Sequence, residues 1–159
     1  MIIEYSRVRQ DVKPPTRANP SDAGLDVYFC PPSPFFEKGD SAIEVAPQTS
    51  VILPTGLRVG VPHGYMLEVK NRSSVAAKRS LIVGACVVDS GYDGEIFVNL
   101  HNVGKETQTI DVWAKIAQLV LTPVVHFRAL ETSGDLYEWY PITISNRGAG
   151  ALGSTDDKQ

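Results

Sequence analysis

Apolar and polar residues alternate in short runs along this chain, and this alternation restricts its fold more than any other feature. Residues 57–61, 65–70 and 96–101 place apolar side chains at every second position, the pattern of a strand with one buried face. A nearly continuous apolar run over 116–125 predicts a buried strand. Turns with Gly and Pro separate the runs. We therefore predict an all-β sandwich, barrel or jelly roll.

Helical signals are confined to one short stretch, residues 74–81. Ser73 or Ser74 is the expected N-cap, because a hydroxyl can accept a hydrogen bond from the free backbone N–H groups of the first turn. No segment has the length or the apolar stripe of a long amphipathic helix. The prediction is at most one short helix.

Length and charge restrict the class of protein. The chain has 159 residues, the size of one ordinary domain, and we expect a single β-rich domain over residues 1–145. Lys and Arg total 15 against 18 for Asp and Glu, giving a net charge of −3. A mildly acidic chain without a basic run is a poor partner for duplex nucleic acid, so none is expected.

Neither a membrane span nor a secretion signal is visible in the sequence. No run approaches the roughly 18 apolar residues of a membrane helix, and Glu4 interrupts the N-terminal segment. Two cysteines, Cys30 and Cys86, are too few for a disulfide framework. These features favour a cytoplasmic location, the host cytoplasm if the chain is viral, and no membrane partner.

The C-terminal segment, residues 146–159, is rich in glycine and polar residues and is expected to be a flexible arm. Gly148, Gly150 and Gly153 have the spacing of a dinucleotide-binding fingerprint. Only six residues follow Gly153, too few for the helix and strand that this fingerprint requires. The bare N–H groups, hydroxyls and one Arg of the arm could instead wrap an anion; a loose chain end is the alternative.

A cation and two hydroxyls, Arg72, Ser73 and Ser74, stand where a predicted strand enters the predicted helix. A helix N-terminus can hold a phosphate through its backbone N–H groups. The segment is therefore a candidate anion site, and a plain N-cap beside a solvated Arg is the alternative.

Three carboxylate or amide residues stand out within apolar surroundings. Residues 84–96 predict a β-hairpin that presents Asp89, with Tyr92 in its turn. Such a carboxylate can act as a general base on water, although a turn Asp more often caps its own backbone. Asp26 and Gln118 each interrupt an apolar strand, so each requires a partner or a function.

Five segments in a fixed order make the chain resemble the trimeric dUTPase family. They are AGLD at 23–26, RSSVAAK at 72–78, VDSGYDGEI at 88–96, AKIAQLV at 114–120 and the Gly-rich 147–155. The resemblance spans nearly the whole chain, and the ordered set is far more specific than any one segment.

The resemblance implies a jelly-roll-like dUTPase fold and a homotrimer whose subunits exchange their C-terminal arms and share three active sites. The reaction implied is hydrolysis of dUTP to dUMP and pyrophosphate, which limits uracil in DNA and supplies dUMP. The cofactor implied is Mg²⁺, carried by the triphosphate of the substrate.

The resemblance also implies roles for the motif residues. Asp89 would activate the water that attacks the α-phosphorus, and Tyr92 would pack against the deoxyribose and exclude a 2′-hydroxyl. The backbone between Gly84 and Asn99 would bind the uracil edge.

The resemblance implies that the remaining motifs would bind the phosphate chain of dUTP and the waters around its Mg²⁺. Phosphate ligands would be Arg72, Ser73, Ser74 and Gln118. Asp26 and Gln118 would hold waters around Mg²⁺, with no direct protein ligand. The arm would close over the substrate with Arg147, Leu152, Gly153, Ser154 and Thr155, where Leu152 replaces the Phe that usually covers the uracil.

Two alternatives stay open. The related dCTP deaminases share the fold and the Arg-Ser-Ser motif, but they need an acid in the strand after the hairpin. This chain has Phe97-Val98-Asn99-Leu100 there, and Glu95 lies too close to the turn. The other alternative is a dUTPase-like trimer that binds or regulates partners, with weak or secondary catalysis.

Overall fold

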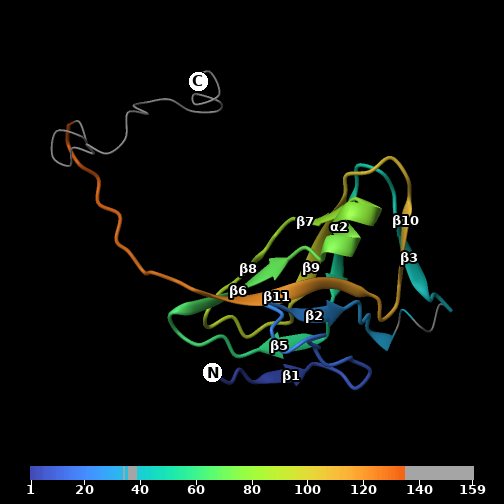
Figure 1. The fold of residues 1–159 in the computed structure, drawn as a ribbon, viewed down its shortest axis with the longest axis horizontal. Coiled ribbons are helices and arrows are strands. Elements are labelled where there is room, and N and C mark those ends of the chain that lie inside the picture. The colour runs from blue at the N-terminus through green and yellow to red at the C-terminus, as the bar shows by residue number, and fades with distance from the viewer. Residues whose placement is uncertain (34, 36–38, 135–159) are drawn as a thin grey trace. The chain divides into compact units, whose positions relative to one another are not determined.

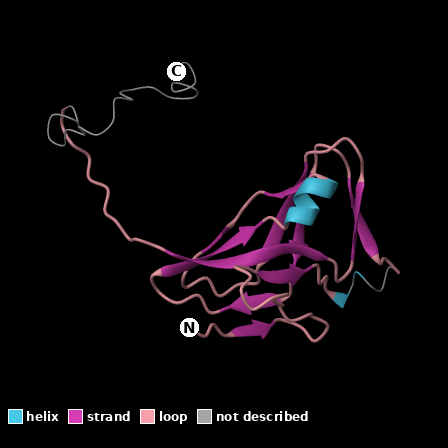
Figure 2. Cartoon of the chain, viewed as in Figure 1, coloured by secondary structure: helices cyan, strands magenta, loops and turns pink. Residues whose placement is uncertain are grey.

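The computed structural model describes residues 1–33, 35 and 39–134. The chain divides into two compact units, Met1–His126 and Phe127–Gln159. All strands of the described residues belong to the first unit, as does the short helix α2 (Ser73–Arg79). Ser33 and Phe35, also in this unit, are helical as well. Residues 127–134, the described part of the second unit, contain neither helix nor strand. The all-β prediction is confirmed for the described residues (Figures 1 and 2).

The described strands form four antiparallel sheets. The largest has the order β2 (Leu25–Tyr28), β11 (Lys115–Pro123), β6 (Tyr65–Lys70) and β8 (Val87–Val88). The second has the order β4 (Ser50–Pro54), β9 (Phe97–Asn102) and β7 (Leu81–Val83). Two-stranded sheets pair β1 (Tyr5–Arg7) with β5 (Leu57–Val59) and β10 (Gln108–Asp111) with β3 (Ala42–Val45).

One hydrophobic core includes the buried faces of both larger sheets. Along β9, Val98, Leu100 and Asn102 are buried while the residues between them are not. The larger sheet contributes Val69 and Leu119 to the same core. The alternation visible in the sequence therefore marks the buried face correctly, and β5, β6, β9 and β11 confirm the predicted strands.

Helix α2 confirms the predicted helix but begins and ends differently. Its N-cap is Arg72, which is extended and makes no side-chain capping hydrogen bond, so the predicted Ser73 or Ser74 cap is wrong. The helix stops at Ser80, whose left-handed φ of 53° lets its N–H reach back to the last turn. Leu81 is already in β7. The two serines are thus left exposed in the first turn.

The predicted hairpin over 84–96 is wrong in its pairing. β7 does pair with β9, and the Gly84 N–H continues that ladder to the Asn99 carbonyl. β8, however, pairs with β6 in the other sheet. The strands on the two sides of the turn therefore lie in different sheets. The prediction failed because alternation shows which face of a strand is buried, but not which strand it pairs with. The turn after Asp89 therefore links two sheets.

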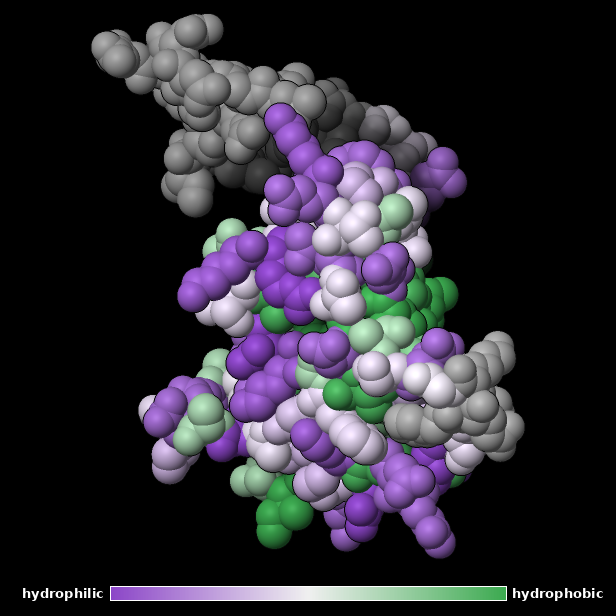
Figure 3. All heavy atoms as spheres, turned by 90° about the vertical axis from the view of Figure 1, so that its right-hand side faces the viewer, coloured by the Kyte–Doolittle hydropathy of each residue, from purple (hydrophilic) through white to green (hydrophobic). Residues whose placement is uncertain are grey.

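The surface is predominantly polar where Figure 3 shows it. Hydrophilic side chains cover most of that face, with hydrophobic ones in smaller areas between them. In the described part of the chain, no helix combines the length and apolarity needed to cross a membrane.

Candidate functional site

Strand register places Asp26, Arg72 and Lys115 together. β11 lies between β2 and β6, so that Gln118 pairs with Asp26 on one side and with Lys70 on the other. Arg72 lies two residues after the end of β6, and its Nε donates to Asp26 Oδ1 at 2.7 Å. Lys115 Nζ lies 2.8 Å from Asp26 Oδ2. Asp26 was expected to need a partner or a function, and within the described part of the chain it has two ion-pair partners.

The Asp26 carboxylate is ionised and held between two cations. Its side chain is only 14% exposed. Burial acts to raise the pKa of Asp26, but the hydrogen bonds and charges of Lys115 and Arg72 outweigh burial and lower it. The same contact raises the pKa of Lys115. Sequence reasoning missed Lys115, although it lies in the 114–120 segment, because only the register brings it opposite β2.

Gln118 joins the same cluster to the start of α2. Its Nε2 donates to the Asn71 carbonyl at 2.9 Å. Gly24 is packed against its other end: a Cβ on Gly24 would lie 2.3 Å from Gln118 Oε1. Three separate sequence segments, 23–26, 71–78 and 114–120, therefore meet at one edge of the larger sheet.

Arg72 keeps hydrogen-bonding capacity after it binds Asp26. Only its Nε is used in that contact, and among the described residues its two terminal nitrogens have no hydrogen-bond partner. Ser73 and Ser74 lie exposed beside it. A partly exposed guanidinium next to two hydroxyls is suited to binding phosphate oxygens.

The turn after β8 presents Asp89 and Tyr92 at a small cavity. The Asp89 side chain is exposed, and its carboxylate has no hydrogen-bond or ion-pair partner in the described residues. Its backbone carbonyl accepts from the Tyr92 N–H at 3.2 Å. The cavity has a volume of about 210 Å³ and is lined by Val87, Val88, Asp89, Tyr92, Glu95, Ile96 and Phe97.

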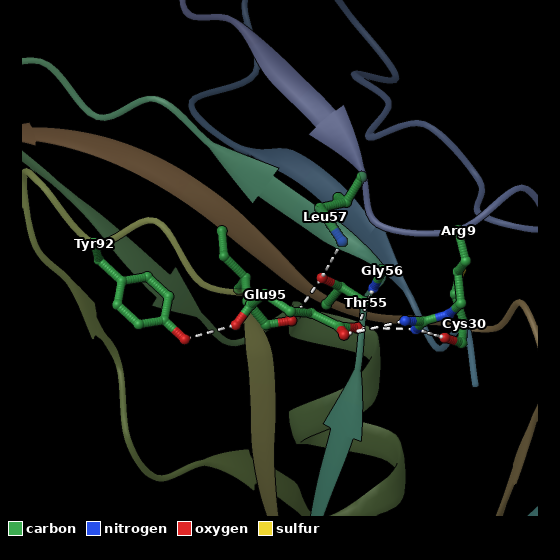
Figure 4. A network of polar contacts seen from close by, with 8 residues as sticks. Arg9, Cys30, Thr55, Gly56, Leu57, Tyr92 and Glu95 are labelled. Carbon is green, nitrogen blue, oxygen red and sulfur yellow. Dashed lines mark hydrogen bonds and ion pairs between the residues drawn. The ribbon is translucent and has the colours of Figure 1, made fainter. Parts of the chain in front are cut away.

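A polar network that sequence reasoning missed closes this turn (Figure 4). The Arg9 guanidinium binds Glu95 through both carboxylate oxygens, at 2.8 and 3.0 Å. The Glu95 carbonyl accepts from the Tyr92 hydroxyl at 2.9 Å. No local pattern in the sequence could reveal a contact between residues 9 and 95.

Gly84 and Asn99 lie against each other at the base of the same segment. Asn99 Oδ1 lies 2.8 Å from His101 Nε2 and would lie 2.2 Å from a Cβ on Gly84. The Asn99 amide also donates to the Val51 carbonyl at 3.3 Å. No side chain fits at position 84 in this arrangement. Strand β6 connects the cluster around Asp26 with the turn after β8. Its Lys70 pairs with Gln118, and its Leu67 pairs with Val88. Lys70 and Leu67 are roughly 10 Å apart along the strand.

These motifs have counterparts in known proteins. The family model described as dUTPase matches residues 10–140. The chain belongs to the dUTPase family. A deoxyuridine 5′-triphosphate nucleotidohydrolase of Serratia proteamaculans is 35% identical over 150 residues, which cover 92% of this chain and 89% of that protein. The prediction of the family from five ordered segments is confirmed.

Solved dUTPase structures share the fold. A mutant dUTPase of Staphylococcus bacteriophage 80alpha with dUpNHpp matches with a TM-score of 0.78 at 20% identity, over 97% of this chain and 98% of that one. A mutant dUTPase from phage phi11 of S. aureus, described as revealing the coordination of a structural Mg(II) ion, matches with a TM-score of 0.72 at 20% identity. That match covers 86% of this chain and 99% of the phage chain. The predicted dUTPase fold is confirmed.

The fifth segment of this dUTPase-family chain stays a prediction. Arg147, Leu152, Gly153, Ser154 and Thr155 lie outside the described residues, as does the predicted boundary between residues 145 and 146. Within the described residues no group of three or more His, Cys, Asp or Glu side chains is placed to hold a metal ion. The predicted water-mediated metal role of Asp26 and Gln118 stays a prediction.

Proposed function

We propose that this chain hydrolyses dUTP to dUMP and pyrophosphate. Membership of the dUTPase family supports the reaction. The observation that carries the mechanism is Asp89, an exposed carboxylate without a partner in the described residues, in the same turn as Tyr92 and on the wall of a cavity of about 210 Å³.

Asp89 is the general base of the proposed reaction. Its carboxylate takes a proton from water as the water oxygen forms a bond to the α-phosphorus. The bond from that phosphorus to the oxygen bridging to the β-phosphate breaks, and pyrophosphate leaves with the electron pair. A carboxylate already engaged by a cation would be a weaker base, and Asp89 has no such partner among the described residues.

The nucleoside occupies the cavity beside Tyr92. Val87, Ile96 and Phe97 line it with apolar atoms, and Tyr92 packs against the deoxyribose so that a 2′-hydroxyl has no room. The backbone between Gly84 and Asn99 binds the uracil edge. The Glu95 carboxylate forms an ion pair with Arg9. Deamination needs a free acid near the base, so this ion pair argues against the deaminase alternative.

The triphosphate binds Arg72, Ser73, Ser74 and Gln118. Asp26 fixes the Arg72 guanidinium through Nε and leaves the terminal nitrogens to bind phosphate oxygens. In the proposed complex the arm residues Arg147, Ser154 and Thr155 close on the γ-phosphate, and Leu152 and Gly153 cover the base.

Mg²⁺ bound by the triphosphate fits the oxygens of Asp26 and Gln118 through water. Arg72 and Lys115 already neutralise the Asp26 carboxylate, which disfavours a direct bond to a third cation, while its remaining lone pairs can accept hydrogen bonds from hydrating water. Mg²⁺ gives up its waters reluctantly. The ion supplies charge neutralisation at the phosphates when it is bound.

A homotrimer with exchanged arms is the proposed assembly. Exposed apolar side chains on one face of the β4–β9–β7 sheet support contact with a second copy. Ile52 is 66% and Phe97 is 47% exposed. They share a face because Ile52 pairs with Asn99, two residues after Phe97. Apolar side chains gathered on one sheet face indicate an interface. Light scattering should give three chain masses, and Ile52→Asp should lower that mass.

The proposed location is the cytoplasm, the host cytoplasm for a viral chain. Cys30 and Cys86 are both free, which supports a reducing compartment. The net charge of −3 supports a protein with no nucleic-acid partner.

The test is pyrophosphate release from dUTP with Mg²⁺, beside dTTP, UTP and dCTP. We expect hydrolysis of dUTP alone. Asp89→Asn should lower turnover by roughly 100- to 10,000-fold. Asp93→Asn is the matched control, since Asp93 is an exposed acid of the same turn, and it should retain turnover. No turnover, or equal turnover of all four nucleotides, would overturn the proposal and favour the partner-binding alternative.

A further inference from the structure

The Arg9–Glu95 ion pair joins two loop segments through two hydrogen bonds and is largely shielded from solvent. Both guanidinium nitrogens that face Glu95 bind separate carboxylate oxygens, at 2.8 and 3.0 Å. The two side chains are only 20% and 17% exposed. Arg9 also donates to the Cys30 carbonyl. A bidentate pair shielded from water fixes the relative orientation of its two partners.

The Glu95 carboxylate is also bound from a third segment. The Gly56 N–H, in the turn between β4 and β5, donates to Glu95 Oε1 at 2.7 Å. The next residue, Ile96, is anchored at the same place: its N–H donates to the Leu57 carbonyl at 2.8 Å, and its carbonyl accepts from the Thr55 hydroxyl at 2.6 Å. The end of the Asp89–Glu95 turn is therefore fixed.

Tyr92 takes its orientation from this fixed end. Its hydroxyl donates to the Glu95 backbone carbonyl at 2.9 Å, so a displacement of Glu95 removes the acceptor. Its ring covers Gly94, where a Cβ would lie 2.4 Å from the hydroxyl oxygen. Figure 4 shows Tyr92 on one side of Glu95 and Arg9 on the other. The chain of contacts runs from Arg9 through Glu95 to Tyr92.

We propose that Arg9 and Glu95 are positioning residues that set the sugar selectivity of the enzyme by holding Tyr92 against the nucleoside cavity. The proposal rests on the proposed function, in which Tyr92 excludes a 2′-hydroxyl. Without Arg9, the shielded Glu95 carboxylate loses its counter-ion and moves toward water. The backbone of residue 95, then held only through its peptide bond to Ile96, gains freedom, and the Tyr92 hydroxyl loses its fixed acceptor.

The experiment compares kcat/KM for dUTP with kcat/KM for UTP in the full chain with Mg²⁺. Loss of folded protein lowers both values equally, so their ratio does not respond to a merely structural role. Arg9→Met and Glu95→Gln should lower the ratio roughly tenfold or more. Arg9→Lys keeps the charge but not the bidentate geometry and should recover part of the ratio.

Arg7→Met is the matched control. Arg7 lies two residues earlier and is exposed. Its side chain makes one hydrogen bond to the described residues, of 3.5 Å, to the Val12 carbonyl. Its ratio should stay within twofold of the wild-type ratio. If Arg9→Met and Glu95→Gln keep the wild-type ratio as well, the proposal is overturned.

A double variant, Arg9→Met/Glu95→Met, separates positioning from folding. Replacing both charges by apolar side chains removes the unpaired charge, and stability is often regained in such replacements. The thermal midpoint should return toward wild type while the dUTP/UTP ratio stays low. A ratio that recovers together with the midpoint would overturn the proposal, because stability alone would then explain the single variants.

Failure of the proposed function gives a different result. If the wild-type chain shows no turnover, calorimetric binding of the non-hydrolysable dUTP and UTP imido analogues gives the same ratio. A wild-type chain that prefers neither sugar contradicts the role of Tyr92 and this proposal together. A selective wild-type chain with equally selective Arg9 variants contradicts only the role of the ion pair.

Discussion

The cluster around Asp26 and the turn around Tyr92 are built in opposite ways. Asp26, Lys115 and Gln118 lie on adjacent strands of one sheet, and Arg72 follows the neighbouring strand. Once β11 pairs with β2 and β6, these side chains must meet. The hydrogen bonds that hold the sheet therefore also assemble the cluster for which we propose phosphate binding.

The turn lies outside any ladder. β8 and β9, the strands on either side of it, belong to different sheets, so Tyr92 has no cross-strand neighbour to orient it. Its hydroxyl is held by the Glu95 carbonyl. The Glu95 carboxylate is held by the Gly56 N–H and by Arg9, a residue 86 positions away. We therefore expect the cluster around Asp26 to tolerate local change better than the turn around Tyr92, where loss of one contact has a larger consequence.

Asp89→Asn should give the largest effect and should separate chemistry from stability. Turnover of dUTP should fall by roughly 100- to 10,000-fold. The free energy of unfolding should stay the same, because the exposed carboxylate has no partner in the described residues. Steady-state kinetics and urea titration measure the two quantities. A marked change in stability would show that Asp89 is a structural residue.

Arg72→Met should affect both activity and stability, in contrast to Asp89→Asn. The variant loses the nitrogens that we propose bind phosphate, and it leaves Asp26 with Lys115 as its ion-pair partner among the described residues. We expect kcat/KM to fall roughly 100-fold and the free energy of unfolding to fall by about 2 kcal/mol. Arg72→Lys is the control that keeps the charge beside Asp26. Unchanged stability in Arg72→Met would mean that the cluster is not held as the structure indicates.

Two glycine substitutions test the comparison directly. A Cβ at Gly94 meets the Tyr92 hydroxyl at 2.4 Å, and a Cβ at Gly24 meets Gln118 Oε1 at 2.3 Å. Gly94→Ala should lower the dUTP/UTP ratio of kcat/KM roughly tenfold. Gly24→Ala should raise KM for both nucleotides and leave the ratio unchanged. Equal effects of both substitutions on the ratio would show that the two regions are not independent.

Acid stability should include a contribution from Asp26, beside one from Glu68, whose pKa is lowered by its hydrogen bond with Lys70. The pKa of Asp26 is lowered from its ordinary value of 3.8, so its pairing stabilises the fold above that pH and the stabilisation is lost as the pH falls below it. Asp26→Asn should cost about 1–2 kcal/mol at pH 7 and should flatten the loss of stability toward pH 3. The raised pKa of Lys115 matters only in alkali. Chemical denaturation across the acid range measures this. An unchanged acid profile in the variant would contradict the Asp26 pairing.

The sequence was sufficient for several of the strands, but not for all of them and not for their partners. Alternation identified β5, β6 and β9 because burial of one face leaves a period of two in the residues themselves. The same alternation suggested a hairpin at 84–96, and β8 in fact pairs with β6. The serine cap of α2 failed for a related reason: Arg72 occupies the cap position because Asp26 binds it from another strand.

By itself, the sequence determined the all-β class and the family, because residue type and order carry this information before the chain folds. It also marked Asp26, Arg72, Asp89, Tyr92 and Gln118 as candidate site residues, whose roles stay predictions. Tertiary structure alone decided that Lys115 joins Asp26 and that Arg9 holds Glu95. These contacts join residues far apart in the chain. Their geometry follows from sheet register and loop packing, which depend on the whole core rather than on any local pattern.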